Sequence, residues 1–284
     1  MTAYEVVAEG LDFPEGPVVM ADGSVIVVEI HGGRVTRCWN GRKEVVAAPG
    51  GGPNGAAIGP DGALWICNNG GIDVINGSPE SGRIERIDLS TGKVERVIEA
   101  CDGKLLSAPN DLIFDCDGNL WFTDLGSFTA NGKDWGGVFC ASGDGNSIVQ
   151  VKHRIISPNG VGLSPDMTTV YVSDTISGRL YAFDRRAEEQ EGRYLGSGLN
   201  DVMFDSMAVT AAGNICVATL TRNGGVTLFT PSGEVRQLRM DDTSVTNIAF
   251  GGEDMTDAWI TFSGRGALVK MRWDEPGLKL VYNA

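Results

Sequence analysis

Residues 109–124 read PNDLIFDCDGNLWFTD. Two short apolar runs, Leu112-Ile113-Phe114 and Leu120-Trp121-Phe122, flank a turn at Gly118, which is typical of two antiparallel strands joined by a tight turn. The same pattern occurs six times in the 284-residue chain, at intervals of about 40 to 55 residues. The apolar or aromatic second strands are centred on Val25-Ile26-Val27, Leu64-Trp65-Ile66, Leu120-Trp121-Phe122, Val170-Tyr171-Val172, Ile215-Cys216-Val217 and Ala258-Trp259-Ile260.

Each pair of strands is followed by a third strand and usually by a fourth. The third strands are predicted at Arg34–Trp39, Arg83–Asp88, Gly137–Cys140, Arg179–Asp184, Val226–Thr230 and Ala267–Trp273. The fourth strands are predicted at Glu44–Ala47, Val94–Ile98, Ile148–Val151 and Glu234–Leu238. Four antiparallel strands repeated at this spacing are typical of propeller blades. We therefore predict an all-β fold, a single six-bladed β-propeller domain over residues 1–284, with four-stranded antiparallel blades around a central channel.

The N-terminus offers a way to close the ring. Glu5–Ala8 precedes Glu15 by the same distance at which the outer strand Glu44–Ala47 precedes Asn54. We therefore expect Glu5–Ala8 to be the outer strand of blade six, which leaves no open edge. A last strand is expected at Leu278–Tyr282, with its pairing partner left open. A β-sandwich would not give six similar units, and a solenoid would not have matching ends.

Composition narrows the environment and the partners. The net charge of −14 argues against nucleic acid and anionic membranes as partners, and no apolar run reaches the length of a membrane span. Residues 1–10 show no basic segment followed by an apolar stretch, so we see no secretory signal. The six cysteines form no CxxC pair, which favours inert free thiols, buried in the case of Cys67 and Cys216. We expect a cytoplasmic protein.

One polar residue recurs seven positions before the turn of every repeat. These residues are Glu15, Asn54, Asn110, Asn159, Asp205 and Asn247. Each precedes an inner strand, so all six side-chain oxygens should meet at one mouth of the channel. Two carboxylates and four amides are hard oxygen donors, which suit Ca²⁺, Mg²⁺ or Mn²⁺ better than Zn²⁺ or Cu²⁺. The alternative is that they are only turn formers at strand entry. Six in one register favour a metal site, because two adjacent carboxylates would repel without a cation.

The chain also resembles a known family. The resemblance is carried by Phe13–Pro17, Pro109–Leu112 with Leu120–Asp124, Ser157–Val161 with Leu163–Asp166, and Asp205–Val209. In this order these motifs resemble the senescence marker protein-30/gluconolactonase/luciferin-regenerating enzyme group, and the bacterial gluconolactonases most of all. The resemblance implies one divalent metal ion, with Ca²⁺ favoured and Mg²⁺, Mn²⁺ or Zn²⁺ as alternatives. It places the metal ligands at Glu15, Asn110, Asn159 and Asp205.

The resemblance also suggests substrate contacts, from Asn54 in the ring and from Asp111 beside a ligand. Two further residues, Asp124 and Phe128, are candidates because a long interblade loop, Gly126–Gly137, follows the third-blade motif. Long loops of this kind often cover the mouth of a propeller and set specificity.

The implied activity is metal-dependent hydrolysis of a small-molecule sugar or sugar-acid lactone. The metal would polarise the carbonyl, and Asp205 is the candidate base. The alternatives are a phosphotriesterase-like hydrolase on the same site and a calcium-binding or interaction propeller without turnover. No GxSxG or HExxH motif supports a serine or zincin mechanism.

Two departures bear on the pocket. Ala108 stands where animal members carry an arginine that contacts sugar hydroxyls, which puts a sugar pocket like theirs in doubt. The chain has only two histidines, His31 and His153. We expect His153 at the surface, and whether His31 faces the pocket stays open.

Overall fold

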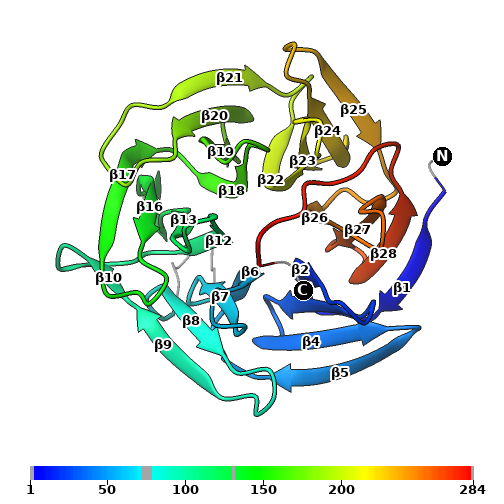
Figure 1. Cartoon of the computed structure of the whole chain (residues 1–284), viewed down its shortest axis with the longest axis horizontal. Coiled ribbons are helices and arrows are strands. Elements are labelled where there is room, and N and C mark those ends of the chain that lie inside the picture. The colour runs from blue at the N-terminus through cyan, green and yellow to red at the C-terminus, as the bar shows by residue number, and fades with distance from the viewer. Residues whose placement is uncertain (1–2, 72–78, 130–131, 283–284) are drawn as a thin grey trace.

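The computed structural model describes residues 3–71, 79–129 and 132–282. Its strands form six four-stranded antiparallel sheets that surround a central channel, together with two small hairpins (Figure 1). The described residues contain no helix. None of them forms a helix that is long and apolar enough to cross a membrane. The prediction of an all-β, six-bladed propeller is confirmed.

Five blades run outward from the channel in sequence order, and the sixth takes its outer strand from the N-terminus. The inner strands are β2 (Pro14–Val19), β6 (Pro53–Ile58), β12 (Pro109–Phe114), β18 (Pro158–Leu163), β22 (Met203–Val209) and β26 (Val245–Gly251). The second strands are β3 (Val25–Glu29), β7 (Leu64–Asn68), β13 (Leu120–Asp124), β19 (Thr169–Asp174), β23 (Ile215–Leu220) and β27 (Asp257–Phe262). The third strands are β4 (Arg34–Trp39), β8 (Arg83–Ile87), β16 (Gly136–Ala141), β20 (Arg179–Asp184), β24 (Gly225–Phe229) and β28 (Ala267–Arg272).

The outer strands complete the blades. They are β5 (Arg42–Ala47), β9 (Val94–Ile98), β17 (Ile148–Ile155), β21 (Arg193–Ser197), β25 (Val235–Arg239) and β1 (Glu5–Glu9). The hairpins pair β10 (Ala100–Cys101) with β11 (Lys104–Leu105), and β14 (Phe128–Thr129) with β15 (Gly132–Lys133). All predicted third and fourth strands are present within a few residues. The outer strand β21 of the fourth blade was not predicted.

The hydrophobic core lies between neighbouring blades. The five residues of β13 are all buried, because this strand packs on both faces. Trp65 of the second blade packs edge-on against Phe114 of the third, with ring centroids 5.5 Å apart. Strands buried on both faces carry continuous apolar runs, which is why the second strands were the strongest sequence signal. All six cysteines are free, and five are buried, with Cys116 exposed at a turn.

The sixth blade closes the ring as expected. β1 pairs antiparallel with β28, with Glu5 opposite Lys270 and Glu9 opposite Ala267. The N-terminal strand therefore supplies the outer edge of the blade that contains the last three strands (Figure 1).

The C-terminal segment differs from the prediction. Leu278–Tyr282 is not a strand. This segment crosses the end of the channel opposite the polar ring and runs toward the centre of the molecule (red in Figure 1). The Leu278 N–H donates to the Val209 carbonyl at 2.8 Å, and the Tyr282 ring lies edge-on to Phe114. The alternating apolar residues that suggested a strand instead pack against the inner strands.

Candidate functional site

A break in strand pairing positions the six ring residues. The ladder between the inner and second strand of every blade shifts register at this point, for example between Glu15 and Val18 in blade one and between Pro109 and Leu112 in blade three. The same irregularity occurs in the other four blades. A β-bulge releases one residue from the ladder and redirects its side chain. The repeated bulge is therefore the local reason why a polar residue recurs in register.

Glycine follows the ring residue in three blades because the inner strands approach closely. A Cβ atom on Gly55 would lie 2.5 Å from the Cα of Asp111, and one on Gly160 would lie 2.7 Å from the Cα of Ser206. Gly16 has φ of +50° and a similar clash with the Asn54 carbonyl. These Glu-Gly and Asn-Gly pairs therefore serve blade packing as well as the bulge.

Glu15 is buried and asymmetrically held. Its Oε2 accepts hydrogen bonds from Asn247 Nδ2 at 2.7 Å and from the Gly16 N–H at 2.6 Å. Its Oε1 is buried without a partner among the described residues. Asn247 Oδ1 in turn accepts from the Ile248 N–H at 2.8 Å, so this amide has only one favourable orientation. Glu15 thus offers one unpartnered oxygen.

Asn159 and Asn110 also present an oxygen with little or no competition. Asn159 Nδ2 donates to Thr175 Oγ1 at 3.0 Å, while its Oδ1 has only a distant contact, 3.5 Å, from Ser206 Oγ. Asn110 Oδ1 is buried without a hydrogen-bond partner in the described part of the chain. An unpaired buried oxygen costs free energy unless a ligand satisfies it.

Asp205 completes the set and interacts with Glu15. Burial raises the pKa of Asp205 well above its usual range, the Glu15 carboxylate raises it further, and a hydrogen bond from Asn159 opposes the change. Burial also raises the pKa of Glu15, against the hydrogen bonds from Asn247 and Gly16. Asp205 keeps part of its surface exposed, whereas Glu15 is 1% exposed. Two carboxylates that repel in this way favour either protons or a cation.

The ring differs from most protein metal sites in the side chains that supply its oxygens. No group of three His, Cys, Asp or Glu side chains that could hold a metal occurs among the described residues. The ring provides two carboxylates, and its other oxygens come from amides. Such donors fit a hard cation, and the unpartnered oxygens of Glu15 and Asn110 are the structural observation in favour of one.

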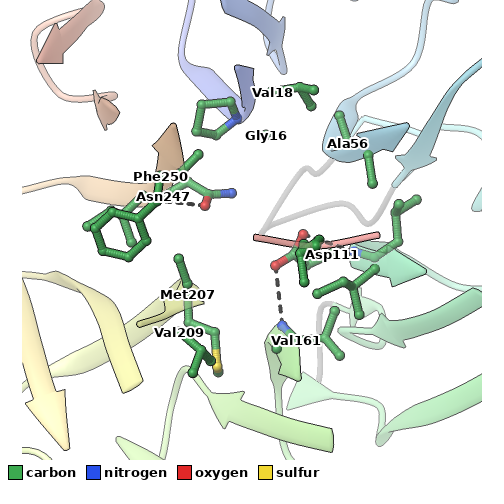
Figure 2. Close-up of a pocket in the computed structure, with 18 of the residues that line it drawn as sticks. Gly16, Val18, Ala56, Asp111, Val161, Met207, Val209, Asn247 and Phe250 are labelled. Atoms are coloured by element: carbon green, nitrogen blue, oxygen red, sulfur yellow. Dashed lines mark hydrogen bonds between the residues drawn. The ribbon is translucent and has the colours of Figure 1, made fainter. Parts of the chain in front are cut away.

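Below the ring lies a cavity of about 110 Å³. Figure 2 shows Asp111 and Asn247 at this cavity together with the apolar side chains of Met207, Val209 and Phe250. Leu278 and Leu280 of the C-terminal segment also line it. The channel is therefore polar at the ring and apolar beneath it.

Asp111 lines this cavity but is held by backbone donors. Its Oδ1 accepts from the Leu112 N–H at 2.9 Å, and its Oδ2 accepts from the Val161 N–H of the next blade at 3.3 Å (Figure 2). Burial raises the pKa of Asp111 to about 7. A substrate contact by Asp111 stays a prediction.

Asp124 is saturated by loop hydrogen bonds. Its Oδ1 accepts from the N–H groups of Ala108 at 2.8 Å and Gly126 at 2.9 Å, and its Oδ2 accepts from Ser107 N–H at 2.7 Å. The second strand ends in a similar residue in three other blades. There, too, the side chain accepts from a backbone N–H of the loop before the inner strand; these residues are Glu29, Asn68 and Asp174. This geometry gives Asp124 a structural task, and a substrate contact by Asp124 stays a prediction.

The remaining candidates lie outside the ring. Phe128 is half-buried in a hairpin, with Lys133 Nζ 5.5 Å from its ring centroid, and residues 130–131 of that loop lie outside the described residues. His31 is 62% exposed, packs on Phe13 with ring centroids 4.7 Å apart, and does not line the channel cavity. His153 is exposed, as expected.

Sequence reasoning missed Thr175 and the task of Asn247. Thr175 follows β19, sixteen positions after the residue that it contacts, and carries no motif of its own. Asn247 was recognised as a member of the ring, but its bond to Glu15 joins residues 232 positions apart. Only the closed ring brings these pairs together.

Comparisons with known proteins agree with this architecture. The gluconolactonase of Zymomonas mobilis is 26% identical over 90% of this chain and 78% of its own length. A solved structure of a gluconolactonase from Xanthomonas campestris superposes with a TM-score of 0.77 at 25% identity, covering 94% of this chain and 88% of the other. Regucalcin from Agrobacterium tumefaciens, described as a calcium-binding protein, shares the fold with a TM-score of 0.73 at 20% identity over 98% of both chains.

Several other curated relatives are named as lactonases, and the chain spans little more than half of their length. The model of one protein family, described as the SMP-30/Gluconolactonase/LRE-like region, matches residues 13–264. That match covers most of the chain and includes every ring residue. The chain belongs to the SMP-30/gluconolactonase/LRE-like family.

Proposed function

We propose that this protein is a lactonase-type carboxylic ester hydrolase that opens a sugar or sugar-acid lactone with the help of one divalent metal ion. Relatives named gluconolactonase, lactonohydrolase and pentonolactonase support the reaction type. The observation that carries the metal is the pair of buried, unpartnered oxygens on Glu15 and Asn110, next to the second carboxylate of Asp205.

The residues that would hold the cation are Glu15, Asn110, Asn159 and Asp205. All four are oxygen donors, which favours Ca²⁺ over softer metals. When bound, such a cation supplies Lewis-acid polarisation of the lactone carbonyl. The two carboxylates would then stay ionised, because the cation offsets the repulsion that raises their pKa.

The chain's own side chains would manage the proton and the substrate. Asp205, which is partly exposed, accepts a proton from the attacking water. The water oxygen bonds to the carbonyl carbon, the ring C–O bond breaks, and the proton passes to the departing ring oxygen. The product is the open-chain hydroxy acid. Asn54, buried in the ring, would orient the substrate through its amide.

Turnover of glucono-1,5-lactone, followed by acid release in a weakly buffered indicator assay, tests this function. We expect hydrolysis above the spontaneous rate, loss of activity in EDTA, and recovery on adding calcium or manganese. Spontaneous-rate hydrolysis with every metal and with several lactones would contradict the proposal. Calcium binding without turnover of any lactone would instead indicate a calcium-binding propeller.

A further inference from the structure

The ring contains two kinds of polar residue. Glu15 Oε1 and Asn110 Oδ1 have no hydrogen-bond partner among the described residues, whereas Asn247 uses its amide to bind Glu15. We propose that Asn247 and Thr175 are positioning residues that orient Glu15 and Asn159, so that one oxygen of each faces a bound divalent cation. This inference rests on the metal site of the proposed function and adds the residues that give that site its shape.

Asn247 sets the orientation of the Glu15 carboxylate. Its own amide is locked, because Oδ1 accepts from the Ile248 N–H at 2.8 Å and only Nδ2 remains for Glu15. That Nδ2 donates to Oε2 at 2.7 Å, and the Gly16 N–H supplies a second bond to the same oxygen. Oε2 has two donors and Oε1 has none among the described residues, which leaves Oε1 as the ligand oxygen. Asn247 Oδ1 already accepts from Ile248 and its Nδ2 is used by Glu15, so we assign Asn247 to positioning and not to ligation.

Thr175 helps to orient the side-chain amide of Asn159. An asparagine side chain can turn by 180° and exchange its oxygen for its NH₂ group at little steric cost. Asn159 Nδ2 donates to Thr175 Oγ1 at 3.0 Å and also to Asp205, and together these two acceptors favour one of these orientations, because the Asp205 carboxylate can only accept. The oxygen then points away from Thr175, where only the 3.5 Å contact with Ser206 competes for it. The opposite orientation would present N–H groups to a cation.

Backbone geometry places Thr175 for this task. Its N–H donates to the Ser157 carbonyl at 2.9 Å, which joins the end of β19 to the loop that enters β18. The corresponding bond in blade three is made by Leu125, whose side chain has no polar group to offer Asn110. The hydroxyl at position 175 is therefore a feature of this blade and is not a requirement of the propeller fold.

The test is a calcium titration of the metal-free protein by isothermal titration calorimetry. Thr175→Val keeps the shape but removes the acceptor, so we expect the Kd for calcium to rise by about tenfold or more, the usual effect of losing a residue that orients a metal ligand. Thr175→Ser restores the hydroxyl and should return the Kd close to that of the unmodified protein. Asn247→Leu should also raise the Kd, because Glu15 loses one of its two donors.

Thr227→Val is the matched control. Thr227 is fully buried in blade five, and its hydroxyl contacts Thr219 Oγ1 at 2.8 Å; in the described part of the chain it forms no hydrogen bond with a candidate ligand. This variant removes a buried hydroxyl and should leave the Kd unchanged. The Tm in EDTA of each variant reports the general cost to the fold.

The outcomes separate this inference from the proposed function. An unchanged Kd in both Thr175→Val and Asn247→Leu would overturn it, as would a loss in Thr175→Val that Thr175→Ser does not reverse or that Thr227→Val shares. If the unmodified protein binds calcium but hydrolyses no lactone, the proposed function fails while the positioning roles can still be confirmed. If it binds none of calcium, magnesium, manganese or zinc, the metal site and this inference fail together.

Discussion

Glu15 and Asp205 carry the same charge in different surroundings. Glu15 is 1% exposed and has one oxygen fixed by two donors, which suits a ligand that does not move. Asp205 keeps part of its surface exposed, which suits a group that meets water. The environment, more than the residue type, therefore divides the tasks of ligand and base between them.

This division predicts different results for two matched amide substitutions. Asp205→Asn and Glu15→Gln each remove one charge and keep an oxygen, so both should weaken metal binding. At saturating metal, Asp205→Asn should lower kcat by about 10² or more, the effect of losing a general base, whereas Glu15→Gln should keep most of kcat. Steady-state kinetics over a metal titration makes the comparison, and equal losses of kcat would leave Asp205 without a proton-transfer role.

The two amides Asn110 and Asn54 should also differ. Asn110 Oδ1 is buried and has no hydrogen-bond partner in the part of the chain that the structure describes, so Asn110→Ala should weaken calcium binding directly. Asn54→Ala should keep the calcium affinity and raise KM, because Asn54 is expected to contact substrate. Calorimetry and kinetics on both variants test this, and equal losses of calcium affinity would show that Asn54 is a ligand as well.

The position of a residue within the repeat was enough to locate some residues of the site and not others. The six ring positions could be located because the repeat places them at a constant distance from the next turn. Asp124 was a candidate because a long loop follows it, and the structure shows that its carboxylate binds the backbone of the adjoining loops. Thr175 could not be recognised, since its importance depends on a contact with another strand.

At the scale of elements, the inner strand decides what the channel can hold. Its bulge lies at the ring residue, and in three blades the following glycine lets the next blade approach. Gly55 packs against the backbone of Asp111, so the strands that carry Asn54 and Asn110 are held close together. The site therefore depends on small residues that make no contact with a ligand.

Gly55→Ala tests this packing. The added Cβ would lie 2.5 Å from the Cα of Asp111, a backbone atom that cannot move aside on its own. We expect the free energy of unfolding to fall by about 1–3 kcal/mol, as for other overpacked sites. Gly196→Ala, in the outer strand β21, meets only the edge of the Phe229 ring at 3.0 Å and should cost much less. Urea denaturation compares them, and equal costs would contradict the argument.

The elements that could not be predicted are those whose pattern serves another contact. No residue of β21 is buried, so this strand lacks the alternation of buried and exposed side chains that marks a strand in sequence. Leu278–Tyr282 alternates like a strand, yet its apolar side chains close the channel. In both cases the pattern reflects what covers the segment, which only the assembled ring determines.

At the scale of the whole molecule, the chain uses both of its ends to complete the propeller. β1 closes the ring at the outside, and the C-terminal segment covers the channel end opposite the polar ring. Leu278 and Leu280 then form the apolar floor of the cavity. Substrate and water would therefore reach the candidate ligands through the mouth that carries them.

The charge of the closed channel predicts how stability depends on pH. Burial raises the pKa of Asp111 to about 7 and also raises the pKa values of Glu15 and Asp205. A carboxyl group whose pKa is higher in the folded than in the unfolded protein stabilises the fold while it is protonated. This stabilisation is complete below about pH 4, where unfolded carboxyl groups titrate, and is lost as the pH rises through about 7.

In EDTA we therefore expect the Tm to fall between about pH 5 and pH 8, contrary to the usual gain of stability as acids ionise. Asp111→Asn should flatten this fall, since the variant has no proton to lose. Calcium should reverse it, because the cation needs ionised carboxylates and competes with their protons. The increase in Tm caused by calcium should then be larger at pH 8 than at pH 5.5. Differential scanning calorimetry in EDTA and in calcium at both pH values measures the two effects. A calcium-induced increase that is the same at both would mean that the cation does not displace protons from Glu15 and Asp205, and that it binds elsewhere on the molecule.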